Sequence, residues 1–278
     1  MPRVTRGFVE IAGGQVHYRC AGREHALGRP ALVMIHASPG SSKMLEDLAK
    51  RFGETRCVYA LDTLGNGDSS PPPSGENPDL PVFVAGHQQA IDALGIQTFD
   101  LYGSHTGGNI ACEIAIAWPG RVRRLILDGM SLFSEEEREE MLRNYAPPIE
   151  IKPDGSHLNW IWNYVRDTYR FWPWYQQDAA HVRDLGLPSA DVLHDKVVEV
   201  IKAARTYRLS YNAAFAYRKE QRLPLVRTPT LLTCARTDML YVYLDRVAAL
   251  MPAAQRDSSA NAGEAMVRML AFLDSEMA

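Results

Sequence analysis

His105 stands between two glycines, Gly103 and Gly107, in a stretch whose pattern predicts a strand, a sharp turn and a helix. A turn with this spacing holds its central side chain in a strained backbone, clear of the sheet and beside the N-terminus of the following helix. Ser104 comes one residue too early to occupy that position. The centre of the turn is therefore an imidazole. The alternative to a functional turn is that the two glycines only allow a helix to pack closely on the sheet.

An imidazole has an unperturbed pKa of about 6.5, so His105 is a competent base near neutral pH. Because a helix N-terminus disfavours positive charge, we expect His105 to stay neutral. Asp238 follows an apolar run at 229–234 and is its candidate acid partner, although such an aspartate could only cap a turn. We expect a water molecule between the two side chains, at hydrogen-bond distances of about 2.8 Å, and we favour activation of that water over direct attack by the imidazole.

Two further residues are candidate acids or bases. Asp128 ends the apolar run that begins at Val122, so it lies at the end of another predicted strand. His157 lies in a turn that leads into an aromatic block, from which it could reach over a pocket. A histidine that simply faces solvent is the alternative for His157.

The aromatic block supplies candidates for a substrate pocket, because pockets are lined mainly by aromatic and apolar groups. Its candidate members are Trp160, Trp162, Phe171 and Trp172. The alternative is that these rings pack only among themselves. His36, at the end of an apolar run, is a further pocket candidate, although a histidine at a strand end is often a hydrogen-bonded structural residue.

The elements that must position these side chains alternate along the chain. A hairpin around Gly13 and Gly14 opens it. Helical patterns then separate short apolar runs, as is typical of parallel strands buried on both faces. The apolar runs lie at 31–36, 57–61, 98–102, 122–127 and 229–234.

The strand pattern stops between residues 131 and 222, where helical stripes and prolines take its place. We therefore expect an α/β fold with a mainly parallel sheet of about eight strands, formed by residues 1–130 and 223–278. Residues 131–222 would form a helical lid over the C-terminal edge of the sheet. Ligands bind at that edge in open parallel sheets.

The composition narrows the class of protein. The 278 residues are 46% hydrophobic, and the formal net charge of −3, without a Lys/Arg cluster, argues against a nucleic-acid surface. Neither a signal core nor an apolar run of bilayer length occurs, so we expect a cytoplasmic protein with no membrane partner. The four cysteines are far apart, which suits reduced, buried thiols and not a metal site. They are Cys20, Cys57, Cys112 and Cys234.

Four segments, in this order and at these separations, resemble the α/β-hydrolase family over nearly the whole chain. They are the oxyanion-like loop His36–Gly40, the Asp-x-x-Gly-x-Gly-x-Ser segment Asp62–Ser69, the elbow Gly103–Gly108 and the acid turn Ala235–Asp238. The chain looks most like the lid-bearing branch, which contains small esterases, dehalogenases, epoxide hydrolases and carbon–carbon hydrolases. This resemblance implies an oxyanion hole made by the backbone N–H groups of Ser38 and Thr106.

The chain departs from the family pattern at two places. The family's elbow carries Ser, Asp or Cys where this chain has His105, and the family's base is a histidine that follows the acid turn. The last histidine here is His194, far before that turn. A Ser-His-Asp relay needs a nucleophile and a separate base, and this chain lacks both.

The sequence therefore predicts an enzyme that cleaves a small, largely apolar carbonyl compound by ester, lactone or carbon–carbon hydrolysis. His105 would act as general base, with no metal and no organic cofactor. Two alternatives stay open, namely a lyase that uses the same base and oxyanion hole, and a non-catalytic protein that binds a small molecule. The chain could also form a homodimer.

Overall fold

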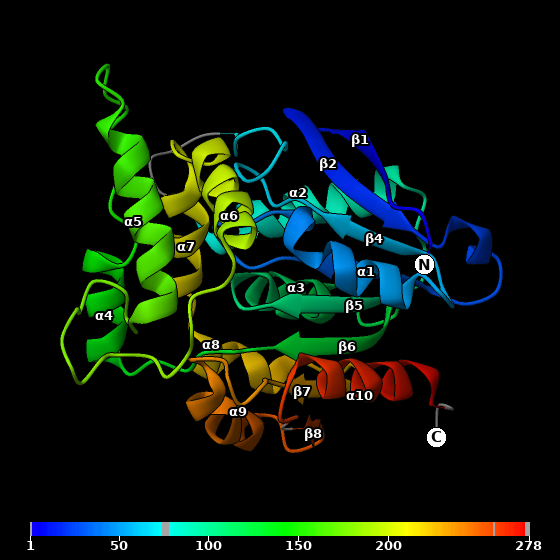
Figure 1. Ribbon diagram of the computed structural model, residues 1–278. Helices are drawn as coiled ribbons and strands as arrows, with labels where there is room; N and C mark the ends of the chain where they lie inside the picture. The colour runs from blue at the N-terminus through cyan, green and yellow to red at the C-terminus, as the bar shows by residue number, and fades with distance from the viewer. Residues whose placement is uncertain (1, 74–77, 258, 276–278) are drawn as a thin grey trace.

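The computed structural model describes residues 2–73, 78–257 and 259–275. Its centre is one sheet of eight strands in the order β1-β2-β4-β3-β5-β6-β7-β8 (Figure 1). The strands are β1 (Thr5–Ile11), β2 (Gly14–Ala21), β3 (Ala31–Ile35), β4 (Val58–Leu61), β5 (Phe99–Ser104), β6 (Val122–Asp128), β7 (Thr230–Thr233) and β8 (Gln255–Asp257).

The sheet is mainly parallel. The opening hairpin pairs β1 with β2 antiparallel, and β2 pairs antiparallel with β4, whereas every other pair is parallel. The α/β class, the eight strands and the hairpin at Gly13 and Gly14 are thus confirmed.

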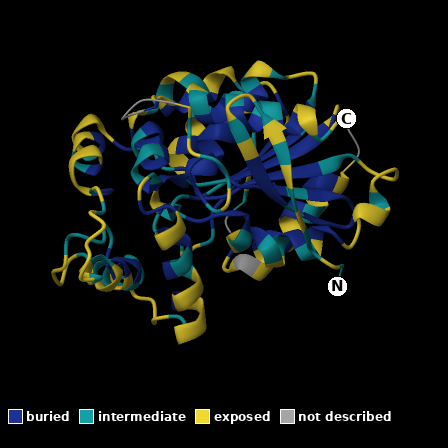
Figure 2. Cartoon of the chain, turned by 90° about the horizontal axis from the view of Figure 1, so that it is seen from above, coloured by how far each residue is buried: buried dark blue, intermediate teal, exposed yellow. Residues whose placement is uncertain are grey.

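Helices cover both faces of the sheet, which explains the unbroken apolar runs. On β3, Val33 and Ile35 belong to the core beneath α2 and α3, whereas Leu32 and Met34 pack on the other side with residues of α1 and α10. The covering helices are α1 (Glu46–Phe52), α2 (Leu80–Ala93), α3 (Thr106–Ala117), α9 (Leu244–Leu250) and α10 (Ala262–Asp274). Figure 2 shows the buried strands in the middle, with exposed residues on the outer surfaces of the helices.

Five helices lie between β6 and β7 in the sequence, in the interval where no strand was expected. They are α4 (Glu135–Asn144), α5 (Ser156–Arg170), α6 (Ala190–Lys202), α7 (Tyr207–Ala216) and α8 (Lys219–Arg222). The arrowheads of β5 and β6 point towards α4–α7 in Figure 1, so these helices face the carboxyl ends of the strands. We propose that residues 131–222 form a cap over this edge.

Short 3₁₀ helices complete the fold: η1 (Arg23–His25), η2 (Ser42–Leu45), η3 (Leu223–Leu225) and η4 (Tyr241–Tyr243). All four cysteines are buried and unpaired, as expected from their spacing. Among the described residues, no helix is both long and apolar enough to cross a membrane.

Candidate active site

His105 occupies the turn between β5 and α3. Its backbone angles are φ 50° and ψ −110°, and it is the only residue other than glycine with a positive φ in the part of the chain that the structure describes. Such a conformation costs about 1 to 3 kcal/mol and persists where the surrounding structure enforces it. One interaction that holds this conformation is a hydrogen bond of 2.9 Å from the His105 N–H to the carbonyl oxygen of Asp128 on β6.

The two glycines of the turn are required by close backbone contacts. A Cβ atom on Gly107 would lie 2.3 Å from the carbonyl oxygen of Ile35, and one on Gly103 would lie 2.5 Å from that of Gly107. Real Cβ atoms do not approach backbone atoms so closely. Glycine is therefore needed at both positions because α3 crosses close to β3 and β5.

Asp238 contacts His105 directly. The Nε2 atom of His105 lies 2.8 Å from Oδ2 of Asp238. The prediction of a water molecule between the two side chains is wrong, because the imidazole is long enough to reach Asp238 directly. An ionised carboxylate can only accept, so His105 donates from Nε2 and keeps the lone pair of Nδ1 free to take a proton.

The pKa values of His105 and Asp238 are shifted in opposite directions. Burial lowers the pKa of His105, but the charge and the hydrogen bond of Asp238 outweigh burial, so the pKa is raised above its ordinary value. Burial raises the pKa of Asp238, and the charge and hydrogen bond of His105 reverse this shift and lower it. The expectation of a neutral histidine rested on the helix N-terminus alone, whereas the bonded carboxylate acts in the opposite direction and favours the protonated ring.

The two residues of the predicted oxyanion hole lie side by side, and the Thr106 hydroxyl occupies the N–H of Ser38. The backbone N–H of Ser38 donates to Oγ1 of Thr106 at 2.6 Å, and that hydroxyl donates to Oγ of Ser38 at 3.0 Å. Oγ of Ser38 then lies 2.7 Å from Oγ of Ser210 on α7. A substrate oxygen that used the Ser38 N–H would have to displace the Thr106 hydroxyl.

His36 supports this loop and does not line the cavity. It is buried, with its Nε2 accepting from the Thr63 N–H at 2.9 Å and its Nδ1 at 2.9 Å from the carbonyl oxygen of Ala37. Burial lowers the pKa of His36, which keeps the ring neutral. The expectation of His36 in the substrate pocket is wrong because both ring nitrogens are used to hold the backbone.

A cavity of about 290 Å³ opens at His105 between the carboxyl edge of the sheet and α5–α7. His105 and Asp238 keep 27% and 25% of their side chains exposed, and His105 forms part of the cavity wall. Ser38, Thr106 and Trp172 also line it, as expected. Most of the remaining wall is aromatic or aliphatic, from Phe133, Tyr145, Tyr164, Val165, Tyr169, Val200, Tyr211, Ala214, Phe215, Met239 and Leu240.

Asp128 and His157 are not part of the cavity wall. Oδ2 of Asp128 accepts from the Tyr102 hydroxyl at 2.7 Å, so this carboxylate lies behind the elbow and only adds to the field that acts on His105. His157 lies in a separate depression, where its Nδ1 accepts from the Lys152 N–H at 3.2 Å. The predicted direct acid or base roles of Asp128 and His157 are wrong, because neither residue lines the cavity.

Three of the four aromatic candidates also lie elsewhere. Trp160 stacks on Tyr164 with ring centroids 5.4 Å apart, so it sits one ring behind the cavity wall. Trp162 is 38% exposed on the outside of α5. Phe171 is buried in the loop after α5, where it pairs with Val182 in an isolated β-bridge. Because successive residues of a helix point in different directions, α5 directs Tyr164 and Tyr169 into the cavity wall but not Trp160 or Trp162.

Three charged residues of the cavity wall were missed by the sequence reasoning. Arg183 lies in the loop before α6, and its charge lowers the pKa of both His105 and Asp238. Lys196 and Glu199 lie one turn apart on α6. A signal was present for this pair, because both flank the apolar stripe Leu193, Val197 and Val200 of an amphipathic helix.

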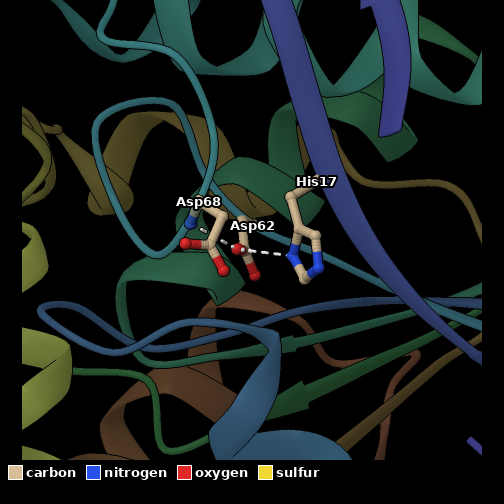
Figure 3. Close-up of side chains that lie close together, drawn as sticks. All are labelled: His17, Asp62 and Asp68. Atoms are coloured by element: carbon tan, nitrogen blue, oxygen red, sulfur yellow. Dashed lines mark hydrogen bonds and ion pairs between the residues drawn. The ribbon is translucent and has the colours of Figure 1, made fainter. Parts of the chain in front are cut away.

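His17, Asp62 and Asp68 form a second polar cluster, shown in Figure 3. Asp62 accepts hydrogen bonds from Nδ1 of His17 at 2.8 Å and from the N–H groups of Ser42 and Asp68 at 2.7 and 2.9 Å. Asp68 pairs with Lys202 of α6 at 2.9 Å. Because these groups already satisfy one another, the cluster is explained as a structural tie between β2, the 62–69 loop and the cap.

A sequence profile described as alpha/beta hydrolase fold matches residues 30–263 of this chain. The chain belongs to the alpha/beta hydrolase fold family. This agrees with the order of the oxyanion-like loop, the elbow and the acid turn around one cavity.

Curated relatives match only parts of the chain. A 2-hydroxymuconate semialdehyde hydrolase of Pseudomonas putida is 37% identical over 113 residues, which are 40% of this chain and 40% of that protein. Epoxide hydrolase 4 of Mus musculus is 30% identical over 125 residues, which are 44% of this chain and 34% of that protein. These matches span well under half the length of either relative.

Solved structures match over the whole length but with low identity. Epoxide hydrolase A from Mycobacterium thermoresistibile superposes with a TM-score of 0.74 and 18% identity, covering 100% of both chains. A bromoperoxidase from Bacillus anthracis also gives 0.74, with 16% identity, over 98% of this chain and 100% of its own. At these identities the likeness concerns the fold alone.

Proposed function

We propose that this protein is a cofactor-free hydrolase of a small, largely apolar carbonyl compound, in which His105 acts as general base. One observation carries the proposal: an imidazole bonded to a carboxylate stands on a strained turn and opens into a mainly apolar cavity. The named activity of the Pseudomonas putida relative, on a semialdehyde, supports a carbonyl substrate.

In the proposed reaction, Nδ1 of His105 removes a proton from a water molecule, and the resulting hydroxide adds to the carbonyl carbon. The π electrons move to the carbonyl oxygen, which the N–H groups of Ser38 and Thr106 stabilise. A well-placed donor of this kind contributes about 3 to 4 kcal/mol. The intermediate then expels its leaving group, which takes the proton from His105, and Asp238 holds the imidazolium throughout.

A lyase is the second candidate. Removal of a substrate proton and stabilisation of an enolate need one base and an oxyanion hole, without a covalent nucleophile. The His105–Asp238 pair meets this requirement, since His105 lines the cavity and Asp238 engages its Nε2, which leaves Nδ1 as the basic nitrogen. Hydrolysis and elimination differ in whether water enters the product.

The test is a screen of esters, lactones and diketones with the wild type and His105→Ala in water labelled with ¹⁸O. Label in the product supports hydrolysis, and an unlabelled product supports a lyase. We expect His105→Ala to lose activity while it still binds the compound. Tight binding without product in both proteins would make this a small-molecule-binding protein instead.

The cellular location belongs to the same proposal. Four buried, unpaired cysteines suit the reducing cytoplasm. A homodimer stays a prediction, and light scattering after size-exclusion chromatography tests it.

A further inference from the structure

The cap carries two charged side chains that the proposed reaction does not use. Lys196 and Glu199 lie one turn apart on α6 and both line the cavity of His105. Glu199 is only 6% exposed, and its Oε2 atom is buried with no hydrogen-bond partner among the described residues. A buried carboxylate oxygen without a partner is costly, so its persistence in a cavity wall indicates a ligand group.

Lys196 does not satisfy this carboxylate. Among the described residues, Lys196 makes no ion pair of 4.0 Å or less with a carboxylate, and Glu199 and Asp195 act on it through their charge without a hydrogen bond. Burial lowers the pKa of Lys196, and the charge of Glu199 acts against that shift. The charges of Lys196 and Glu199 therefore interact, but the two side chains do not form a hydrogen bond or a close ion pair.

The pair lies on α6, whereas Asp238 lies in the turn between β7 and α9. The charges of Lys196 and Glu199 act on the pKa of His36, behind the oxyanion-like loop, whereas Arg183 acts on His105 and Asp238. A substrate whose carbonyl group sits at His105 can place its remote end against α6, because His105, Lys196 and Glu199 line the same cavity.

The charges of Lys196 and Glu199 determine which chemical group of the substrate can bind between them. A carboxylate would be repelled by Glu199, and an ammonium group would be repelled by Lys196. A hydroxyl group has one proton to donate and two lone pairs to accept with, so it can donate to Glu199 and accept from Lys196 at once.

We propose that Lys196 and Glu199 form a hydroxyl-binding subsite, and that the substrate is a carbonyl compound with an alcohol or phenol group at its far end. This inference rests on the proposed function for the placement of the carbonyl group. The subsite itself is tested by binding, which needs no turnover.

The experiment measures dissociation constants by isothermal titration calorimetry for three matched ketones: octan-2-one, 8-hydroxyoctan-2-one and 8-methoxyoctan-2-one. The wild type should bind the hydroxy ketone about tenfold more tightly than octan-2-one, the effect of one or two hydrogen bonds to charged groups. The methoxy ketone can accept but not donate, so it should lose most of this advantage.

Two variants assign the effect to residues. Glu199→Leu and Lys196→Met should each reduce the preference for the hydroxy ketone to about threefold or less, with the affinity for octan-2-one retained as a check on folding. His194→Gln, an exposed change on the same helix, should leave the preference as it is in the wild type.

Equal binding of the hydroxy ketone and octan-2-one by the wild type would overturn the inference, as would absence of saturable binding of the hydroxy ketone. Equal binding of the methoxy and hydroxy ketones would also overturn it, because Glu199 would then have no role. A hydroxyl preference together with no turnover of any ester, lactone or diketone in the screen would leave the subsite standing and refute only the proposed function.

Discussion

At the scale of single residues, the pair His105 and Asp238 is the centre of the proposed reaction. The 2.8 Å contact fixes which ring nitrogen carries the proton and raises the pKa of the imidazole. A base works only when deprotonated, so the proposed activity should rise with pH through a pKa above the ordinary value for histidine.

Asp238→Asn should move this rise to lower pH. Removal of the carboxylate destabilises the imidazolium, so the pKa of His105 falls and the base is free in more acidic solution. The maximal rate should drop about 10- to 100-fold, because the amide supports the developing imidazolium poorly. A profile of kcat/KM against pH measures both effects, and an unmoved midpoint would show that another group is the base.

Thr106→Ala should raise kcat/KM about three- to tenfold, the effect of one net hydrogen bond. In the wild type the Thr106 hydroxyl accepts the Ser38 N–H at 2.6 Å and competes with the substrate oxygen. Thr106→Ser keeps a hydroxyl and should show a smaller gain. A loss of activity in Thr106→Ala would instead assign the hydroxyl itself as the oxyanion donor.

At the scale of elements, the elbow depends on backbones that nearly touch. Gly107→Ala would push a methyl group into the carbonyl oxygens of Ile35 and His36, at 2.3 and 2.6 Å. We expect a loss of stability of about 3 kcal/mol or more, since α3 must lift from the sheet. Gly120→Ala is the matched control, because no atom lies within 4 Å of its added Cβ and its φ is not positive.

Urea denaturation followed by circular dichroism measures these changes. Gly120→Ala should remain within about 0.5 kcal/mol of the wild type. If Gly107→Ala were equally stable, the close crossing of α3 and β3 would not be what the glycine protects.

At the scale of the whole molecule, a buried ion network ties the sheet together near the amino ends of β5 and β6. Arg56 and Asp100 are both fully buried, with Nη1 of Arg56 3.2 Å from Oδ2 of Asp100. Arg123 contacts the same oxygen at 2.6 Å, and Arg56 also pairs with Asp274 at the end of α10. The network joins four segments of the chain: Arg56 just before β4, the strands β5 and β6, and the end of α10.

Arg56→Met should cost about 3 kcal/mol at neutral pH, because it leaves a buried carboxylate with one partner fewer. Burial already raises the pKa of Asp100, and the loss of Arg56 raises it further. The folded state then binds a proton more tightly than the unfolded state, so the deficit should shrink as the pH falls through that pKa. Urea titrations at several pH values test this, with exposed Arg51→Met as control; a deficit independent of pH would contradict it.

The sequence by itself determined the alternation of strands and helices, the position of the elbow at His105 and the meeting of Ser38, Thr106, His105 and the acid turn at one edge. These follow from local rules, since apolar runs specify buried strands, glycines specify tight turns, and parallel strands end at the same edge.

Only the tertiary structure decided how the side chains meet. Whether His105 reaches Asp238 directly depends on the length of the imidazole across two loops 133 residues apart. The exclusion of His157 and Trp160 depends on how α5 is rotated, and the inward placement of Lys196 and Glu199 depends on how α6 packs. The sequence pattern predicts which helical face is apolar, but the register of that face against a partner is set by packing between distant segments.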